Sequence, residues 1–523
     1  MTPGPERPTA SDVQPAAGPS TRGAPLEPEH LTDLGNARRL VRLFGNTTIC
    51  YVPPWKTWLV WVGTHWQRDE TGEVDRLAKA VVAGIYAEAG YEQDRGRREE
   101  LAKHAVRSES VRAIQAMITL AQTEAGIPVL PEQLDRDPWA LNVANGTLDL
   151  QTGTLRPHRR EDLLTKLIPV DYDAAAPCPT WMRFLERIFT GRPQLIAFLQ
   201  RALGYALTGD TSEQCFFLFH GAGSNGKTTF IETTADLLDA YAQRLAIETL
   251  LARRPGDAVA MNDLFTIMGA RFVSAVEPDM GRRLAEAVVK QLTGGDTIKA
   301  KKLYTDLLSY RPTFKLFLST NHKPTIRGTD HAIWRRIKLV PFDVVIPDAE
   351  QDRTLPEKLR GEQAGILAWA VQGCLVWQQE GLGTPEEVRA ATTRYRTEMD
   401  TLGEFLAECY VREKAAWVSA AALYTTYLDW TKHAGEPAIS KRALGSRLAD
   451  RGLQPMKSQQ QRGWLGLRPA DTETHGTHQD TDSNKPPSRA RVGGFYENRV
   501  RDTSNASQDD LPAWVTETEE DGQ

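Results

Sequence analysis

A glycine-rich segment at residues 221–229 constrains the fold more than any other part of this chain. It reads Gly-Ala-Gly-Ser-Asn-Gly-Lys-Thr-Thr and directly follows the apolar run Cys-Phe-Phe-Leu-Phe at 215–219. Glycines at its first and sixth positions let backbone N–H groups surround phosphate oxygens, because no Cβ stands in the way. A helix-compatible stretch at 229–241 follows and would place its positive end at the phosphates. The order of buried strand, loop and helix predicts a phosphate-binding loop in an α/β domain; a glycine-rich turn without nucleotide is the alternative.

The loop also predicts which residues hold a nucleoside triphosphate. The Lys227 ammonium would reach the β and γ phosphates, and the Thr228 hydroxyl would hold Mg²⁺. We therefore expect ATP and Mg²⁺ as cofactors. The expected ATP-binding residues are Gly221, Ala222, Gly223, Ser224, Asn225, Gly226, Lys227, Thr228 and Thr229.

Two later apolar segments end in polar side chains that would complete a hydrolytic site. Residues 271–277 read Arg-Phe-Val-Ser-Ala-Val-Glu, and 314–321 read Phe-Lys-Leu-Phe-Leu-Ser-Thr-Asn. We expect Glu277, with Asp279 as its helper, to organise Mg²⁺ and activate water. We expect Asn321 to orient that water and sense the γ-phosphate. Ordinary polar strand ends are the alternative for both segments.

A pair of arginines follows the second of these segments. Arg335 and Arg336 lie within Ala-Ile-Trp-Arg-Arg-Ile at 332–337. An arginine supplied by a neighbouring subunit would stabilise the charge on the transferring phosphoryl group. We expect Arg336, with Arg335 as the second choice, to have this role. A surface pair with ordinary carboxylate partners is the alternative.

A lysine-rich segment lies between the two apolar segments. Lys299, Lys301 and Lys302 follow two glycines, and only Asp296 opposes them. The alternation at 297–301 predicts a strand with its lysines on one face. Such lysines, repeated around an oligomer, would follow the phosphate backbone of single-stranded DNA. The alternative is a charged strand edge that resists aggregation.

Composition and length indicate a soluble protein of several domains. The chain has 523 residues, of which 41% are hydrophobic and 25% charged, so about three folded units are expected. The net charge of −5 indicates that any nucleic-acid-binding surface is local. Five scattered cysteines form no C-x-x-C pair, which argues against structural zinc and fits a reducing cytoplasm. We recognise no signal peptide or membrane-spanning run and expect a cytoplasmic protein without a membrane partner.

The two ends and the region before the loop differ in composition. Residues 1–28 and 471–523 are rich in small and polar residues and are predicted to be disordered. Between 29 and 170 we expect an α+β domain, because helical periodicity at 74–89 and 110–124 alternates with β-like runs. Four tryptophans recur there at strand spacing, and we favour the core of a small sheet over base stacking for them. They are Trp55, Trp58, Trp61 and Trp66.

The segment 396–470 is predicted to form a winged-helix-like domain. Ser440 would cap a helix, and a short hairpin would follow it. That helix carries Lys441, Arg442 and Arg447, as a helix that reads the major groove of DNA would. The alternative is a surface helix whose cations complement its own dipole.

Taken in order, these segments resemble the motifs of superfamily 3 helicases, and most closely the phage, plasmid and poxvirus primase-helicase group. Beyond the loop and the strand ending at Glu277, the resemblance rests on the lysine-rich segment 292–302, on Ser-Thr-Asn-His-Lys-Pro at 319–324 and on the arginine pair. It covers roughly residues 31–469. Pro278 follows Glu277 where some members carry a second acid, so the division of metal and base roles between Glu277 and Asp279 stays open.

The resemblance implies an AAA+-like P-loop ATPase that assembles as a hexameric ring and translocates 3′ to 5′ along single-stranded DNA. It also implies that the lysine-rich segment forms a hairpin projecting into the channel. The expected layout is a disordered tail at 1–28, an α+β domain at 29–170, a helical linker or collar at 171–205, the ATPase domain with a helical lid at 206–395, the winged-helix-like domain at 396–470 and a second disordered tail at 471–523.

We therefore expect an ATP-dependent DNA helicase that acts in replication of a phage, plasmid or integrated element in a bacterial host. Its expected partners are single-stranded DNA, replication forks or origin DNA, further copies of this chain, and a separate primase or initiator. Primase activity is not expected, because the residues ahead of the ATPase offer no cysteine–histidine cluster and no paired acids. The alternatives are a replication initiator or DNA-bound ATPase switch without processive unwinding, and a nucleotide or small-molecule kinase. A kinase would leave Asn321 and the lysine-rich segment unexplained.

Overall fold

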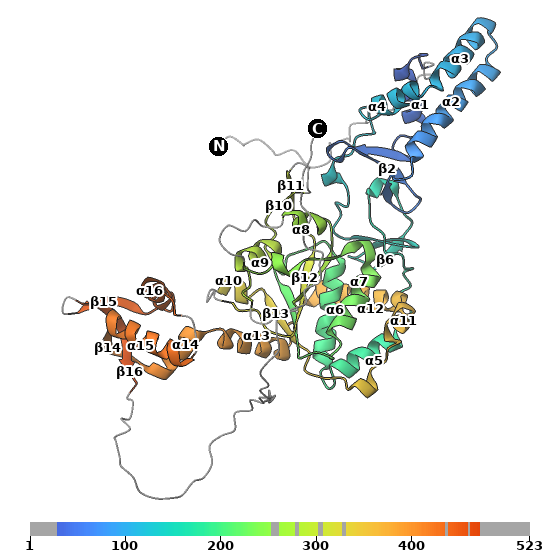
Figure 1. Cartoon of the computed structure of the whole chain (residues 1–523). Helices are drawn as coiled ribbons and strands as arrows, with labels where there is room; N and C mark the ends of the chain where they lie inside the picture. The colour runs from blue at the N-terminus through green and yellow to red at the C-terminus, as the bar shows by residue number, and fades with distance from the viewer. Residues whose placement is uncertain are drawn as a thin grey trace, which may run out of the picture.

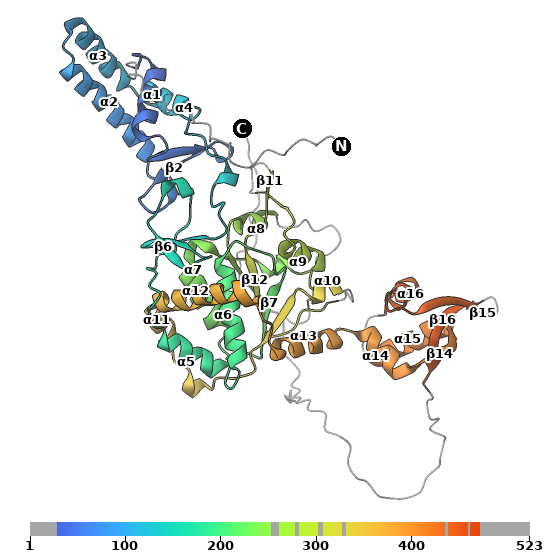
Figure 2. The same cartoon turned by 180° about the vertical axis from the view of Figure 1, so that it is seen from behind.

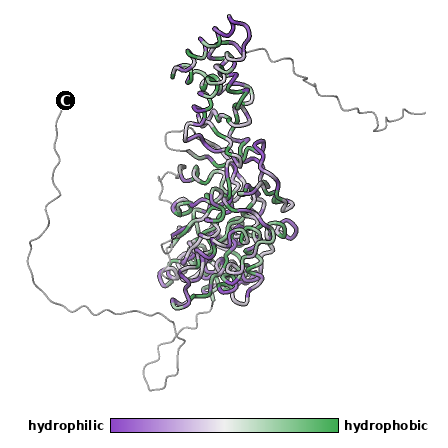
Figure 3. The backbone as a smooth tube through the Cα atoms, turned by 90° about the vertical axis from the view of Figure 1, so that its right-hand side faces the viewer, coloured by the Kyte–Doolittle hydropathy of each residue, from purple (hydrophilic) through white to green (hydrophobic). Residues whose placement is uncertain are grey.

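The computed structural model describes residues 29–252, 261–277, 282–301, 307–326, 331–434, 438–458 and 461–470. Both tails that we predict to be disordered lie outside these ranges. An α/β core occupies the middle of the molecule, with the N-terminal helices projecting from one end and the C-terminal unit from one side (Figure 1). Apolar and polar segments alternate along the trace in Figure 3. Within the described ranges, no helix combines the length and the apolar character needed to cross a bilayer.

The core is built on one sheet of five parallel strands, in the order β13-β7-β12-β9-β8. Strands β7, β9 and β12 begin and end within one residue of the apolar segments predicted from the sequence, because strands buried on both faces read as continuous apolar runs. Strand β12 lies between β7 and β9, with Leu318 opposite both Leu218 and Ala275. The strands are β7 (Phe216–His220), β8 (Ala242–Arg244), β9 (Phe272–Glu277), β12 (Lys315–Thr320) and β13 (Ile337–Pro341).

Helices cover both faces of this sheet. One face packs Phe217 and Phe317 against helices α5, α6, α7, α11 and α12, and the other packs Phe216 and Leu218 against helices α8, α9, α10 and α13. The segment expected as a linker or collar therefore contributes α5 and α6 to the core around the central sheet. The helices are α5 (Pro179–Ile188), α6 (Pro193–Leu207), α7 (Lys227–Leu238), α8 (Met261–Thr266), α9 (Glu286–Thr293), α10 (His331–Trp334), α11 (Leu355–Arg360), α12 (Gln363–Glu380) and α13 (Glu386–Glu398).

Helices α6 and α12 cross at glycines. A Cβ on Gly204 would lie 2.1 Å from the backbone nitrogen of Cys374, and one on Gly373 would lie 2.1 Å from the Gln200 carbonyl oxygen. Such distances are far inside van der Waals contact, so only glycine permits this close approach. The crossing fixes the helical layer behind the phosphate-binding loop.

The N-terminal region has two small sheets and four helices, as an α+β domain should. Trp66 is buried and donates its indole N–H to the Arg160 carbonyl, while Trp55, Trp58 and Trp61 are partly buried against the same sheet, so their predicted packing role is confirmed. The elements are α1 (Asp33–Phe44), β1 (Ile49–Val52), β2 (Thr57–Trp61), β3 (Trp66–Arg68), α2 (Glu73–Tyr91), α3 (Arg95–Ser108), α4 (Val111–Ala121), β4 (Ala140–Val143), β5 (Gly146–Asp149) and β6 (Thr154–Arg156).

The C-terminal unit has its own core, formed by Phe405, Leu423, Leu444 and Trp464 among others. Its three strands pair antiparallel in the order β14-β16-β15. The Ser440 hydroxyl accepts a hydrogen bond from Ala443 N and caps α16, as the sequence predicts. The elements are α14 (Thr401–Cys409), β14 (Tyr410–Ser419), α15 (Ala420–Ala434), α16 (Lys441–Asp450), β15 (Gln454–Ser458) and β16 (Gln461–Pro469), of which α14 and β14 were not predicted.

Candidate nucleotide-binding site

The carboxyl ends of three neighbouring strands meet at one edge of the central sheet. Strand β7 runs directly into the phosphate-binding loop, β9 ends at Glu277, and Thr320 at the end of β12 lies opposite both His220 and Glu277. In parallel α/β sheets, ligands bind at this edge. The structure therefore brings together three segments that are far apart in the sequence.

The loop has the backbone geometry of a phosphate cradle. Gly223 and Gly226 have φ values of 108° and 85°, and Ser224 has a φ of 46°. A Cβ on Gly221 would lie 2.2 Å from the Phe342 carbonyl oxygen. These conformations leave the backbone N–H groups at the start of α7 available to an anion, which the positive end of that helix also attracts.

Lys227 lies at the centre of the site. Its Nζ donates to Gly221 O at 2.7 Å, to Asn225 Oδ1 at 3.0 Å and to Asn321 Oδ1 at 3.0 Å. The side chain is only 4% exposed, and burial lowers its pKa from 10.5 to about 8. All three acceptors are neutral, so phosphate oxygens would be stronger partners for this cation. The residues of the loop and Asn321 therefore fit the phosphates of a nucleoside triphosphate.

The remaining loop residues divide by exposure. Ala222, Ser224 and Thr228 are exposed at the mouth of the loop, and Thr229 is half-buried. Asn225 is 3% exposed, and its Nδ2 donates to Phe342 O at 3.1 Å while its Oδ1 accepts from Lys227. Asn225 therefore supports the loop and the lysine from behind.

The catalytic residues predicted on the neighbouring strands are described in part. Asn321 is exposed beyond β12, and its contact with Lys227 places it at the phosphate end of the loop. The backbone of Glu277 lies at the same edge, but its side chain lies outside the described part of the structure, as does all of Asp279. Their roles stay predictions.

The two arginines occupy different environments. Arg335 is exposed and donates to Gln214 Oε1 at 3.1 Å. Arg336 is 8% exposed; it donates to Thr293 Oγ1 at 3.2 Å and to Ala332 O at 2.7 Å within its own chain. In this arrangement Arg335 is the one accessible to a neighbouring molecule.

The lysine-rich segment forms the first strand of an antiparallel hairpin, as the resemblance implies. Strand β10 (Ile298–Lys301) pairs with β11 (Leu307–Tyr310), Ile298 and Ala300 are fully buried, and Lys299 is exposed. The predicted one-sided strand is therefore confirmed at Lys299. Lys302 and the side chain of Lys301 lie outside the described residues.

Helix α16 belongs to the C-terminal unit, which projects to one side of the α/β core (Figures 1 and 2). Lys441 and Arg442 are exposed at the start of the helix, and Arg447 is half-buried. None of the three forms an ion pair with another described residue. They leave a positive face available to a polyanion.

Sequence reasoning missed His220, which precedes the loop, and a contact between the segment after Asn321 and helix α13. Burial, and then the charges of Lys323 and Lys227, lower the pKa of His220. Lys323 pairs with Glu398 of α13, with Nζ 2.6 Å from Oε2. The one available signal was a lysine two residues after a predicted sensor; its partner lies 75 residues away and could not be inferred.

Comparison with known proteins agrees with the motifs. Residues 37–190 match the family "D5 N terminal like". The chain is 27% identical over 329 residues to "Putative helicase L207/L206" of Acanthamoeba polyphaga mimivirus, covering 58% of this chain and 34% of the relative. It is 24% identical over 387 residues to "Putative helicase 022R" of Frog virus 3, covering 58% and 40%. It is 24% identical over 324 residues to "Putative primase C962R" of African swine fever virus, isolate Tick/Malawi/Lil 20-1/1983, covering 57% and 34%.

The chain thus spans well under half the length of these relatives. The apo structure of the NrS-1 C terminal region (305-718) is similar in fold, with a TM-score of 0.51 at 9% identity, over 84% of this chain and 100% of that one. The resemblance to the superfamily 3 primase-helicase group is confirmed, through distant homology and a D5 N terminal like domain.

Proposed function

We propose that this chain, a distant homologue of the viral helicases and primases described above, is an ATP-dependent DNA helicase that works as a ring on single-stranded DNA. The observation that carries the proposal is the contact between Lys227 of the phosphate-binding loop and Asn321 of the neighbouring strand. That contact joins a phosphate-binding cation to a γ-phosphate sensor in one site, as ATP hydrolysis coupled to movement requires.

We assign each residue of the nucleotide site a role in ATP hydrolysis. The loop from Gly221 to Thr229 binds the phosphates, Lys227 stabilises the charge that develops on them, and the exposed Thr228 hydroxyl holds Mg²⁺. Asn321 orients the attacking water, and Glu277 takes its proton. Bound Mg-ATP supplies the phosphoryl group whose transfer to water releases the free energy for translocation.

A ring explains why an arginine lies outside its own site. Because Arg336 is buried within its own chain, we assign the finger role to Arg335. Arg335→Ala and Lys227→Ala proteins, each inactive alone, should regain part of the activity when mixed, since some interfaces then pair an intact loop with an intact arginine. A finger is worth roughly a thousandfold or more in related sites. Absence of rescue in a mixture shown to co-assemble would place the arginine within its own site or make it structural.

The hairpin lysines are proposed to follow the DNA backbone in the channel. Replacing Lys299, Lys301 and Lys302 together by Ala should lower affinity for single-stranded DNA and flatten its salt dependence, because fewer counterions are released. Basal ATP hydrolysis should survive. Normal DNA binding and unwinding by this variant would make these lysines a protective strand edge.

The C-terminal unit is proposed to bind duplex DNA through Lys441, Arg442 and Arg447 of α16. Exposed Lys457 and Arg462 lie directly opposite each other on β15 and β16. Like charges at paired positions repel each other, and a phosphate between them would remove that repulsion. The acids Asp400 and Glu413 are instead paired with Arg451 and Arg468.

The decisive experiment measures ATP hydrolysis with and without single-stranded DNA, beside a mass measurement of the assembly. Stimulated hydrolysis by a ring supports the helicase. A DNA-bound switch or initiator is the second candidate, and it would unwind once per binding event but fail in multiple-turnover translocation. We place the protein in the cytoplasm of a bacterial host, in replication of a phage, plasmid or integrated element, beside a separate primase or initiator.

A further inference from the structure

Helix α13 contacts the segment that follows Asn321 and leads along the chain into the C-terminal unit. It packs on edge strand β13, where Leu339 N donates to Thr392 Oγ1 at 3.2 Å. Its other end leads directly into α14 (Figure 2). Any change at the nucleotide site that moves α13 therefore also moves the C-terminal unit.

The nucleotide-site end of this connection is built from the residues that follow Asn321. Tyr395 is fully buried on α13, donates its hydroxyl hydrogen to the Pro324 carbonyl and stacks edge-on against Trp334 at 5.2 Å. Glu398, one turn further along, pairs with Lys323 at 2.6 Å. The Lys323 ammonium also lies 5.6 Å from the centre of the Tyr395 ring.

The segment between Asn321 and these contacts is held rigidly. The Thr320 hydroxyl accepts from His322 N at 3.0 Å and donates to His322 O, which closes the turn around Asn321. Lys323 and Pro324 follow at once. A displacement of Asn321 should therefore also displace α13.

The other end of the connection reaches the DNA-facing helix. Only Met399 and Asp400 separate α13 from α14. Asp400 caps α14 by accepting from Gly403 N at 3.0 Å, and it also pairs with Arg451, directly after the last residue of α16. A continuous set of contacts thus runs from the nucleotide site to the end of α16.

We propose that Lys323, Tyr395 and Glu398 are positioning residues that couple the state of Asn321 to the orientation of the C-terminal unit. Phosphates that draw Lys227 away from Asn321 supply the switch, because phosphate oxygens and the Asn321 amide oxygen compete for the same ammonium group. Nucleotide then changes the affinity of the C-terminal unit for duplex DNA, and by linkage duplex DNA changes the affinity for nucleotide. This inference rests on the proposed ATPase and DNA-binding functions.

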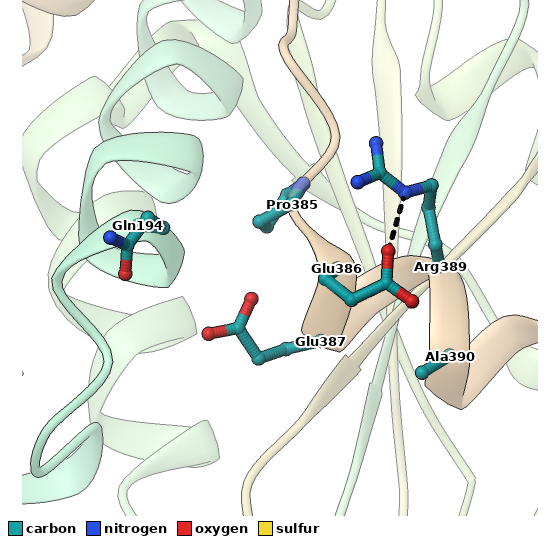
Figure 4. Close-up of a pocket in the computed structure, with 6 residues that line it drawn as sticks. All are labelled: Gln194, Pro385, Glu386, Glu387, Arg389 and Ala390. Atoms are coloured by element: carbon teal, nitrogen blue, oxygen red, sulfur yellow. Dashed lines mark hydrogen bonds and ion pairs between the residues drawn. The ribbon is translucent and has the colours of Figure 1, made fainter.

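The test compares two ion pairs on the same helix. Glu398→Gln and Tyr395→Phe each remove one contact to the segment after Asn321. Glu386→Gln is the matched control: it breaks the exposed Glu386–Arg389 pair, 3.0 Å long, at the opposite end of α13 (Figure 4). That end borders an open pocket of about 660 Å³ beside Gln194 and has no contact with Asn321 in the described structure.

Two quantities are measured on the full chain. The first measurement is the steady-state kinetics of ATP hydrolysis, which gives kcat and KM. The second is the ratio of dissociation constants for a short mixed-sequence duplex in the presence of ADP and of a non-hydrolysable ATP analogue. We expect the wild-type ratio to differ from one by about fivefold to tenfold. Glu398→Gln and Tyr395→Phe should bring it close to one and lower kcat with KM unchanged, while Glu386→Gln keeps wild-type values.

A charge exchange separates coupling from simple damage. Lys323→Glu combined with Glu398→Lys should restore the wild-type ratio, which a merely disrupted helix would not do. If the wild type binds duplex DNA equally well with ADP and with the ATP analogue, the proposed coupling is wrong. Wild-type ratios in both single variants would also overturn it. Either result leaves the helicase proposal standing. A wild-type protein that hydrolyses no ATP overturns the proposed function itself, and that is read from the first measurement alone.

Discussion

The two ends of the central sheet both bury cations, but they hold them differently. At the carboxyl edge, Lys227 is held by two side-chain amides and one loop carbonyl. At the opposite edge, Arg271 and Lys315 stand at the starts of β9 and β12. Their hydrogen bonds go to main-chain carbonyls and one hydroxyl, and each also lies over a tyrosine ring. None of the three forms an ion pair with a carboxylate among the described residues.

The cations at the amino edge complete the end of a helix. Arg271 donates to Leu207 O and to Ala140 O, each at 2.6 Å, and Lys315 donates to the Thr208 carbonyl and to Asp210 O at 3.1 Å. The last carbonyls of a helix such as α6 lack intrahelical partners and carry the negative end of its dipole. Burial lowers the pKa of both side chains. The two cations tie the N-terminal region and α6 to the catalytic strands.

The kind of hydrogen-bond partner distinguishes a buried cation in a ligand-binding site from one with a structural role. The exposed Asn321 amide can turn away when phosphates compete for Lys227, at little cost to the fold. The carbonyls bound to Arg271 and Lys315 are main-chain groups, and they cannot turn away unless the backbone itself moves. A buried cation therefore indicates a ligand site only when its partners are exchangeable.

The largest effect that tests this contrast is expected at Lys227. Lys227→Ala should lower ATP turnover by about a thousandfold, because it removes the charge that stabilises the transferring phosphoryl group. The urea midpoint of unfolding should stay close to the wild-type value, since the partners of Lys227 are neutral and its removal leaves no charge unpaired. Turnover close to that of the wild type would place the hydrolytic site elsewhere.

The second-largest effect is expected at the amino edge of the sheet, where a substitution should lower stability and leave nucleotide binding unchanged. Arg271→Met should lower the free energy of unfolding by about 3 kcal/mol, because buried carbonyls lose charged donors. The KM for ATP of the folded fraction should not change. Arg244→Met is the control, because Arg244 is exposed on the neighbouring strand and pairs only with exposed Glu232. Equal stability of the two variants would show that the amino-edge cation is dispensable.

The smallest effect is a pH dependence of nucleotide binding. Because burial lowers the Lys227 pKa to about 8, the folded apo protein loses this proton before the unfolded chain does. Its free energy of unfolding should therefore rise between pH 8 and 10.5, where the unfolded state binds more protons. Affinity for ATP should fall by about tenfold per pH unit above this pKa, as measured by calorimetry. A Lys227→Arg protein should show a flat profile, and a flat wild-type profile would contradict the shift.

Much of the nucleotide site was predictable because its pattern is local. The loop needs glycine where φ is positive at residues 223 and 226, and the strands that carry Glu277 and Asn321 are continuous apolar runs. Their convergence also follows from parallel pairing. The position of β12 between β7 and β9 does not, since it depends on contacts between segments about a hundred residues apart.

Other features depend on packing that a single sequence does not encode locally. Arg335 and Arg336 look equivalent in the sequence, yet only Arg336 is fixed in the interior, where it donates a hydrogen bond to Thr293 of α9. Helix α3 escaped prediction because its segment, Arg-Gly-Arg-Arg-Glu-Glu at the start, shows little apolar periodicity. Arg271 and Lys315 gave only a weak signal, a single cation within or before an apolar run.

The separate core of the C-terminal unit makes this part of the molecule exchangeable. Phe405, Leu423 and Trp464 pack among themselves. The two core clusters around the central sheet include no fully buried residue beyond Tyr395, and the partly buried Met399 packs against one of them. A chain cut after Glu398 would keep the entire ATPase sheet and its helical layers. Recombination between related genes at this joint could therefore replace the unit that we propose to bind duplex DNA and leave the central sheet unchanged.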